Sequence, residues 1–392
     1  MKHVANTLIF VTLLLGVGCG DSDTATTPGA WVWDLPDTVP EPRIPEDNPM
    51  SAEKVELGRF LFYDKRLSAN QTQSCGSCHV QELAFTDGLP QAEGSTGQIH
   101  PRGSMSIANS AYAASLTWAN QALVLLERQA RVPIFGEEPV ELGMANMEDE
   151  LLRRMQEDAR YPEMFAAAFP DEQEPISLDS ITKAIAAFQR QVTSFKSPID
   201  RWQQGDRTAL SESAQRGLAL FFGGTNEAGV DDAFECFHCH GGFLFSQSSD
   251  DAGQVFDQKF FMNNGLYSLD ADGSYPAGNQ GLYEMTGDPK DKGRFKPPSL
   301  RNIAVTAPYM HDGSIETLEE VLDHYARGGR LIESGPNAGD GKDNPNKSAF
   351  LNGFVMSEQE KQDIIAFLHA LTDEDLLTNP AYSDPFAQQS DE

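Results

Sequence analysis

The chain carries two copies of a short pattern in which two cysteines stand three residues apart and a histidine follows directly. The first copy reads Ser74-Cys75-Gly76-Ser77-Cys78-His79, and the second reads Glu235-Cys236-Phe237-His238-Cys239-His240. Residues three apart lie on one face of a helical turn. Both cysteines can therefore bond to the two vinyl groups of one haem, with the adjacent histidine below the iron. The pattern predicts two covalent haem c groups, one on Cys75, Cys78 and His79 and one on Cys236, Cys239 and His240.

A reactive thiol pair or a zinc site is the alternative interpretation of each cysteine pair. Zinc needs four ligands, and neither pair has a second C-x-x-C nearby. The fifth cysteine of the chain is Cys19, so the pattern leaves none for a structural disulfide. We interpret His238, which stands between the cysteines of the second motif, as a surface or propionate-side residue and not as a ligand.

The N-terminus is typical of an export signal. Lys2 and His3 precede an apolar run over residues 8–17 that is too short to span a bilayer. Gly18 and Cys19 then resemble a lipoprotein cleavage site, although Gly16 stands where leucine is usual; ordinary signal-peptide cleavage nearby is the alternative. The sequence predicts a periplasmic or cell-envelope protein whose membrane contact is a lipid anchor at Cys19.

Composition limits the partners. The 392-residue chain has a formal net charge of −30 at pH 7. Such a surface repels nucleic acid and anionic membranes, and it suits small ligands or a basic protein partner.

An internal repeat predicts the domain organisation. Ser51 starts a helical pattern that leads through Gly58 to the first motif, and Ser211 starts one that leads through Gly217 to the second. We expect a mostly α fold of two c-type cytochrome-like haem domains with long loops and little β structure. The predicted segments are a signal peptide (1–19), a Pro- and Asp-rich tether (20–49), an N-terminal haem domain (50–205), a C-terminal haem domain (206–385) and a tail (386–392).

Apolar periodicity predicts helices over residues 122–130, 147–157, 181–202, 316–327 and 357–371, with Ser177 as a capping start. In the helix over 316–327, the apolar stripe runs through Leu318, Val321 and Leu322. Tyr325 falls on that stripe and is expected to point inward, whereas His324 is expected to point outward. Spacing alone leaves open whether Tyr325 is a core residue or a ligand.

These motifs together resemble the bacterial dihaem cytochrome c peroxidase and MauG family. The resemblance covers roughly residues 45–375. It rests on both haem motifs and on L-G-R-F-L-F at 57–62, D-K-R-L-S at 64–68, A-F-T-D-G at 84–88 and P-S-L-R-N-I-A-V-T-A-P-Y-M-H-D-G at 298–313. L-T-W-A-N at 116–120 and P-I-F-G-E-E-P-V-E-L-G at 133–143 resemble the MbnH type, in which the enzyme oxidises a tryptophan on a partner protein.

The resemblance implies that the N-terminal haem domain is peroxidatic and that the C-terminal one transfers electrons. It also implies roles for individual residues. Tyr325 matches the axial ligand of the second haem, where the peroxidases have methionine; a phenolate is a hard anionic donor that favours high oxidation states of iron. Trp118 matches the tryptophan between the haems, a stepping stone for electron transfer. Glu141 matches the acid/base of the first haem's distal pocket, with Gln129 orienting it and Pro133 leaving the sixth iron position open.

The chain also departs from the family pattern. Two extra residues separate Pro133 from Glu141, so Glu137 and Glu138 compete for the acid/base role. Ser95 stands where the peroxidases have a histidine that closes the first haem, which predicts an open site.

Two further positions follow from the same comparison of motifs. His100 is interpreted as a surface or pocket-rim residue. The resemblance implies calcium bound by the carbonyls of Lys296 and Pro298, but Gly103 replaces the asparagine ligand and weakens that prediction.

Three functions are consistent with this pattern. The first is a peroxide-dependent enzyme that oxidises tryptophan on a partner protein. The second is a cytochrome c peroxidase that reduces hydrogen peroxide with electrons from a carrier cytochrome. The third is a non-enzymatic dihaem electron carrier, which would have strong ligands on both sides of both irons.

Overall fold

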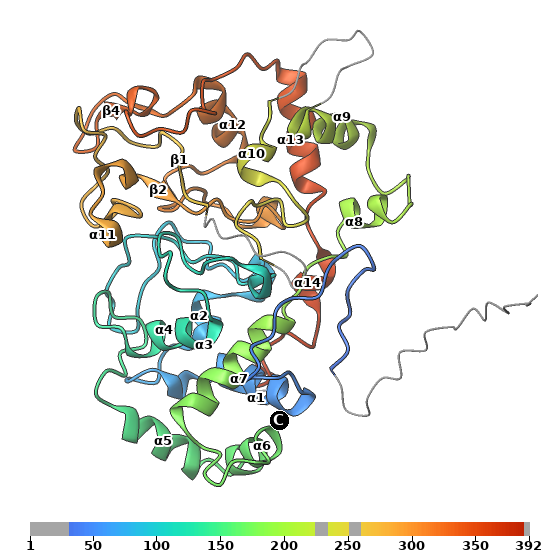
Figure 1. The fold of residues 1–392 in the computed structure, drawn as a ribbon, viewed down its shortest axis with the longest axis vertical. Coiled ribbons are helices and arrows are strands. Elements are labelled where there is room, and N and C mark those ends of the chain that lie inside the picture. Colours follow the sequence, from blue (N-terminus) through green and yellow to red (C-terminus); the bar gives the residue numbers. More distant parts are fainter. Residues whose placement is uncertain (1–30, 224–233, 251–259, 388–392) are drawn as a thin grey trace, which may run out of the picture.

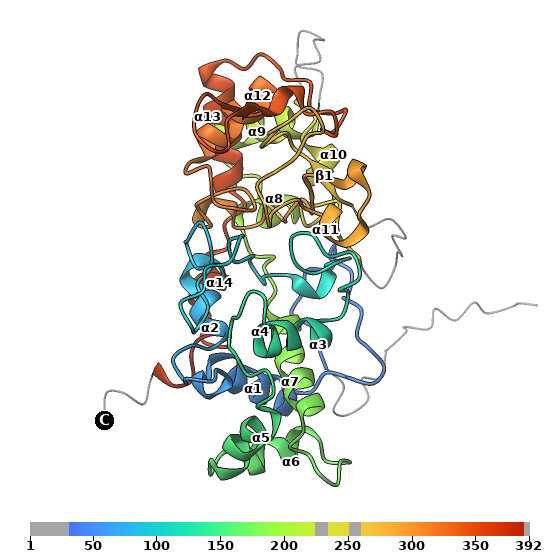
Figure 2. The ribbon, with the colours of Figure 1, turned by 90° about the vertical axis from the view of Figure 1, so that its left-hand side faces the viewer.

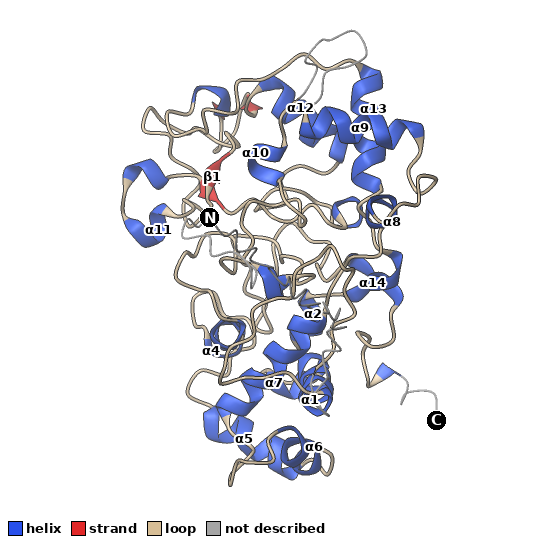
Figure 3. Ribbon diagram, turned by 45° about the vertical axis from the view of Figure 1, so that its right-hand side comes forward, coloured by secondary structure: helices blue, strands red, loops and turns tan. Residues whose placement is uncertain are grey.

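The computed structural model describes residues 31–223, 234–250 and 260–387. This part of the chain is mostly helical, with long loops and two small antiparallel sheets, β1–β2 and β3–β4 (Figures 1 and 3). The predicted fold class is confirmed in that respect. The predicted signal peptide, Cys19, the start of the tether and the end of the tail lie outside the described residues. The helices are α1 (Ala52–Tyr63), α2 (Cys75–Cys78), α3 (Leu126–Gln129), α4 (Arg131–Phe135), α5 (Glu148–Glu157), α6 (Tyr161–Ala168), α7 (Leu178–Gln191), α8 (Pro198–Gln203), α9 (Glu212–Phe222), α10 (Phe237–His240), α11 (Tyr283–Thr286), α12 (Leu318–Arg327), α13 (Glu358–His369) and α14 (Glu374–Thr378), and the strands are β1 (Met262–Asn263), β2 (Arg294–Phe295), β3 (Leu331–Ile332) and β4 (Gly339–Asp340).

The first half is built on the crossing of α1 and α7. Ser51 caps α1 by accepting a hydrogen bond from the Lys54 amide, and Ser177 caps α7 in the same way from Ser180. The helices cross at Gly58, where an added Cβ would lie 1.9 Å from the Ala184 carbonyl oxygen. Only glycine allows the two backbones to approach so closely.

The second half repeats this arrangement with α9 and α13. Ser211 caps α9 through the Ala214 amide, and Ser357 caps α13 through Glu360. The helices cross at Gly217, where an added Cβ would lie 2.0 Å from the Asp363 carbonyl oxygen. The repeat seen in the sequence thus corresponds to two helix crossings of the same geometry, each leading into one cysteine motif.

Figure 2 shows the crossing of α1 and α7 in the lower half and that of α9 and α13 in the upper half. A hydrophobic core accompanies each crossing. The first gathers around Leu57, Leu61 and Phe188, and the second around Phe221, Phe367 and Leu371. The predicted boundary near residue 205 follows α8, which lies between α7 and α9 along the chain. That boundary stays a prediction.

The C-terminal segment packs on the first half. Leu376 of α14 and Tyr382 belong to the first core, and the Gln81 side-chain amide donates to the Leu376 carbonyl at 2.9 Å. The Tyr63 hydroxyl donates to the Tyr382 carbonyl at 2.7 Å. Residues 374–387 therefore connect the end of the second half to the first half.

Two predicted helices differ from the structure. The helix expected over residues 181–202 is two helices, because Pro198 starts α8 and its ring disfavours helical backbone at Ser197. Asn109 satisfies the break by accepting from the Ser194 amide at 2.9 Å. The helix expected over 122–130 is only α3, because the Asn120 side chain accepts from the Ala122 and Leu123 amides and forms a turn.

Among the described residues, no helix is long and apolar enough to cross a membrane.

Candidate active site

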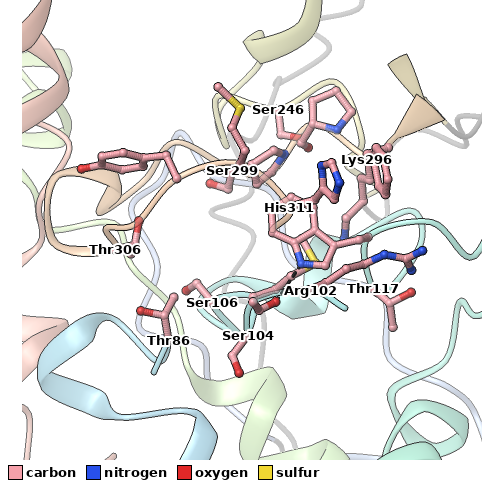
Figure 4. Close-up of a pocket in the computed structure, with 18 of the residues that line it drawn as sticks. Thr86, Arg102, Ser104, Ser106, Thr117, Ser246, Lys296, Ser299, Thr306 and His311 are labelled. Carbon is pink, nitrogen blue, oxygen red and sulfur yellow. Dashed lines mark hydrogen bonds between the residues drawn. The ribbon is translucent and has the colours of Figure 1, made fainter. Parts of the chain in front are cut away.

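A single cavity of about 770 Å³ lies between the two halves and reaches both cysteine motifs. Its walls come from segments far apart in the sequence, including the loop over 100–120 and the loop over 295–313 (Figure 4). Every site residue predicted from the sequence lines it: Cys75, Cys78, His79, Trp118, Gln129, Pro133, Glu141, Cys236, Cys239, His240 and Tyr325.

The first motif forms the one-turn helix α2. Ser74 and Ser77 cap it reciprocally, which fixes Cys75 and Cys78 on one turn. The His79 Nδ1 lies 2.9 Å from the Phe85 carbonyl oxygen, and burial lowers the pKa of His79. A neutral imidazole that donates from Nδ1 keeps the lone pair of Nε2 free for a metal. The geometry fits a proximal iron ligand.

The second motif has the same design in α10. The His240 amide donates to the Cys236 carbonyl at 3.0 Å, and His240 Nδ1 lies 3.3 Å from the Phe245 carbonyl oxygen. Burial lowers the pKa of His240 to about 4, so this imidazole is also neutral. Phe85 and Phe245 both have left-handed backbone, with φ of 63° and 51°. Each accepting carbonyl thus comes from a residue in a conformation that non-glycine residues rarely adopt.

His238 lies at the edge of the second motif. Its ring stacks between Phe237 and Phe350, with centroids 4.3 and 4.4 Å away. It is half-buried and lines the cavity.

Tyr325 enters the cavity from α12, on the side of the second motif. Its hydroxyl is hydrogen bonded to the Asn264 side chain, and this contact opposes the rise in its pKa caused by burial. The inward orientation predicted from periodicity is thus what the structure has. A phenol oxygen facing the cavity that contains His240 fits an axial ligand.

The outward orientation predicted for His324 is wrong. Its side chain is buried, with 5% exposure, and its ring contacts Tyr325 edge to face at 5.0 Å. The reason is tertiary: the chain after α12 turns back at Gly328 and packs on that face, where the Arg330 amide donates to the Gly265 carbonyl at 2.9 Å. The apolar periodicity of one helix gives no information about a distant loop that covers its other face.

Trp118 lies where the two halves meet. Its indole Nε1 donates to the Gly103 carbonyl at 2.9 Å, and its own carbonyl accepts from the Lys296 amide at 2.8 Å. The indole is thus fixed by the first half, and the backbone of Trp118 is fixed by the second half. Gly103, Lys296 and Pro298, the positions of the predicted calcium site, also line the cavity; calcium binding stays a prediction.

Lys296 also carries a buried charge that sequence reasoning did not predict. Its Nζ donates to the Ser115 carbonyl at 2.8 Å, and burial lowers its pKa to about 8. Next to it, the His311 ring stacks on Phe295 with centroids 3.7 Å apart, and in Figure 4 Arg102, Lys296 and His311 lie close together. The sequence signals for this pair are the lysine directly after Phe295 and the histidine near the end of the 298–313 motif.

Glu141, Gln129 and Pro133 gather on the side of the first motif. Gln129 ends α3 and Pro133 lies in α4, and the Leu142 amide donates to the Pro133 carbonyl at 2.8 Å. Burial raises the pKa of Glu141 to about 7. A carboxyl group that titrates near neutral pH is suited to taking and returning a proton.

The competing acids are placed differently. Glu138 lines the cavity, whereas Glu137 is absent from its walls and is exposed. His100 lines the cavity beside Glu141. Its position agrees with the predicted pocket-rim location.

Comparisons with known proteins identify the family. The family model described as di-haem cytochrome c peroxidase matches residues 52–208. The methylamine utilization protein MauG of Methylorubrum extorquens is 35% identical over 86% of this chain and 82% of its own length. The cytochrome-c peroxidase IdrP1 of a Pseudomonas species is 39% identical over 85% of this chain and 84% of its own length.

The solved structures agree. The crystal structure of a MauG-like protein associated with microbial copper homeostasis superimposes with a TM-score of 0.87 at 52% identity, covering 91% of this chain and 100% of that one. The family resemblance predicted from the motifs is confirmed. The chain belongs to the di-haem cytochrome c peroxidase and MauG family, and it is a haem-dependent oxidoreductase with two haem c groups.

Proposed function

We propose that this protein uses hydrogen peroxide to oxidise a tryptophan on a partner protein. Tyr325 is the single observation that carries the proposal, because its hydroxyl faces the part of the cavity that contains His240. A thioether at this position would favour the reduced iron of an electron-accepting haem. A phenolate is a hard anionic donor and favours oxidised iron, which suits storage of oxidising equivalents.

The positions of the side chains around the cavity support the following assignment of haem-binding residues. Cys75, Cys78 and His79 would hold the first haem, and Cys236, Cys239, His240 and Tyr325 would hold the second. When bound, the haems supply the iron that cleaves the O–O bond of peroxide and accepts the oxidising equivalents.

Glu141 moves the proton during peroxide cleavage. Its carboxylate takes a proton from one peroxide oxygen and returns it to the other, which leaves as water. Gln129 orients the bound peroxide by its side-chain amide, and Pro133 offers no ligand atom, so the position opposite His79 stays open. Glu138 is placed to substitute only partly, because its side chain is exposed whereas that of Glu141 is half-buried.

Trp118 links the two halves as a stepping stone for electrons. Its Nε1–H donates to a backbone carbonyl, which is a poor base, so the indole can pass an electron without losing its proton. The buried ammonium of Lys296, which donates to the Ser115 carbonyl on the segment of Trp118, disfavours positive charge resting on the indole. Both features suit brief rather than stable oxidation of Trp118.

The experiment compares wild type, Tyr325→Met and the matched control Tyr283→Met, whose position lies outside the cavity. Purified holoprotein receives hydrogen peroxide and a candidate partner, and mass spectrometry follows oxygen addition to the partner's tryptophans. Tyr325→Met should raise the midpoint potential of the second haem and abolish this oxidation, whereas Tyr283→Met should change neither.

Two outcomes would contradict the proposal. An unchanged potential in Tyr325→Met would show that Tyr325 is not a ligand. Peroxide consumption by wild type with a reduced carrier cytochrome, and no modified tryptophan on any partner, would make the protein a cytochrome c peroxidase like its relative IdrP1 by name. We also propose that the protein is exported, carries a lipid anchor at Cys19 and binds calcium. The mass of the mature protein tests export and the anchor, and its metal content tests calcium.

A further inference from the structure

His100 lies beside Glu141 on the cavity wall, and it has no role in the chemistry proposed above. Its Nε2 lies 3.8 Å from a carboxylate oxygen of Glu141. That nitrogen is buried and has no hydrogen-bond partner among the described residues. A small side-chain rotation closes the gap to hydrogen-bonding distance.

The backbone fixes this pairing. Residues 92–102 form a tight loop in which the His100 amide donates to the Ala92 carbonyl at 2.8 Å. The Ser95 amide donates to the Glu141 carbonyl at 2.7 Å, and the Gln98 side chain accepts from the Val140 amide at 2.9 Å. The loop that carries His100 is therefore attached directly to the segment that carries Glu141.

The charged neighbours of His100 have other partners. Arg102 donates to Asn279 at 2.8 Å and to Glu284 at 2.6 Å, and Asp87 accepts from the Ser104 hydroxyl at 2.8 Å. On the other side, Glu141 lies near Cys75 and Cys78, and its charge contributes to the raised pKa of both thiols. Burial and Arg102 lower the pKa of His100, which favours its neutral imidazole.

The proton balance gives this pair a task. The two protons of hydrogen peroxide leave in the first water, so the second water needs two protons from outside together with two electrons from the donor. Glu141 lines the cavity with 36% of its side chain exposed, and its carboxylate must receive these protons in the second half of the cycle.

We propose that His100 is the positioning and relay partner of Glu141, handing external protons from its Nε2 to the Glu141 carboxylate during the reductive half-reaction. This inference rests on the proposed acid/base role of Glu141. Glu141 then acts in both peroxide cleavage and the reductive half-reaction, whereas His100 acts only in the reductive half-reaction.

The test uses holoprotein with His100→Gln, His100→Ala, Glu141→Gln and the matched control His369→Gln, an exposed histidine at the end of α13. Stopped-flow absorption follows the reaction with peroxide, and then the return to the resting spectrum with ascorbate as electron donor. His100→Gln should keep the peroxide phase within about twofold of wild type and slow the return by about tenfold or more. Its solvent deuterium isotope effect on the return should rise, and imidazole should restore the return rate in His100→Ala.

A readout independent of turnover is the infrared carboxyl band of Glu141, isolated as the difference between each protein and its Glu141→Gln version. If Glu141 donates to His100 when protonated, loss of the imidazole lowers the pH at which this band titrates. His369→Gln should leave the band and both phases unchanged.

Three results would overturn the inference. The first is a normal return phase and unchanged band in His100→Gln while Glu141→Gln is slow, which refutes the relay but leaves Glu141 as acid/base. The second is a normal peroxide phase in Glu141→Gln, which refutes the proposed role of Glu141 itself. The third is a low-spin first haem that becomes high-spin in His100→Gln, which would place Nε2 on the iron.

Discussion

At the scale of single residues, the site depends on groups whose protonation is set by burial. His79 and His240 are kept neutral by desolvation and oriented by a carbonyl at Nδ1, whereas Glu141 is kept protonated up to about pH 7. Desolvation favours the neutral form of each of these groups. It thereby supports imidazoles that can bind a metal and a carboxyl group that titrates near neutral pH.

Glu141 makes the rate of the peroxide phase depend on pH. The carboxyl group acts as a base only when ionised, and its pKa is raised to about 7. The rate should therefore rise with pH and level off above neutrality. Glu141→Gln should slow this phase by about 10²–10⁴-fold and remove the pH dependence. Stopped-flow measurement between pH 5 and pH 9 checks this, and a pH profile retained in the variant would assign the base elsewhere.

The sequence predicted most of these residues, because covalent haem attachment requires two cysteines at a fixed short spacing and a histidine directly after the second. Tyr325 was predicted by helical periodicity together with family resemblance. His324 was misplaced, and the pairing of His100 with Glu141 was missed. Both depend on loops folding back over an element, and neither leaves a periodic signal in one sequence.

At the scale of elements, each half depends on one helix crossing at a glycine. Ser51, Ser177, Ser211 and Ser357 cap the four helices, and these starts were visible in the sequence. The break before α8 was missed, because the apolar pattern continues through it although Pro198 marks it. Tertiary contacts from Asn109 stabilise the break, and these lie too far away in the chain to be inferred from local pattern.

Gly217→Ala tests the second crossing. In a free helix alanine would gain about 1 kcal/mol over glycine. Here the new Cβ would lie 2.0 Å from the Asp363 carbonyl oxygen, so the helices must separate. We expect a loss of about 1–3 kcal/mol in the free energy of unfolding.

Denaturant unfolding measures this loss. Ala219→Gly, on the exposed face of α9, is the control and should cost only about 1 kcal/mol of helix propensity. A Gly217→Ala protein that is more stable than wild type would show that the crossing tolerates the methyl group.

At the scale of the whole molecule, both motifs share one cavity, and the surface carries a large negative charge. The chain has 59 acidic and 29 basic residues, which gives the formal charge of −30. A charge of this size steers a basic protein toward the molecule over a distance set by the ionic strength.

The reaction with a cationic electron-donor protein should therefore depend on salt. Between about 0.01 M and about 1 M salt, the Debye length falls from about 30 Å to about 3 Å. The second-order rate constant should fall by about tenfold or more over this range. The rate with ascorbate should not fall, because a small anion is repelled rather than attracted. A rate with the cationic protein that is independent of salt would place docking on a neutral part of the surface.

The return of residues 374–387 to the first half has a consequence for maturation. The cysteines of both motifs line the cavity, and Cys75 also packs against the first hydrophobic core, to which Leu376 and Tyr382 belong. Thioether formation requires an attachment enzyme to reach these sulfurs. We therefore expect haem attachment at Cys75 to precede the docking of residues 374–387, which then closes the first core of the holoprotein.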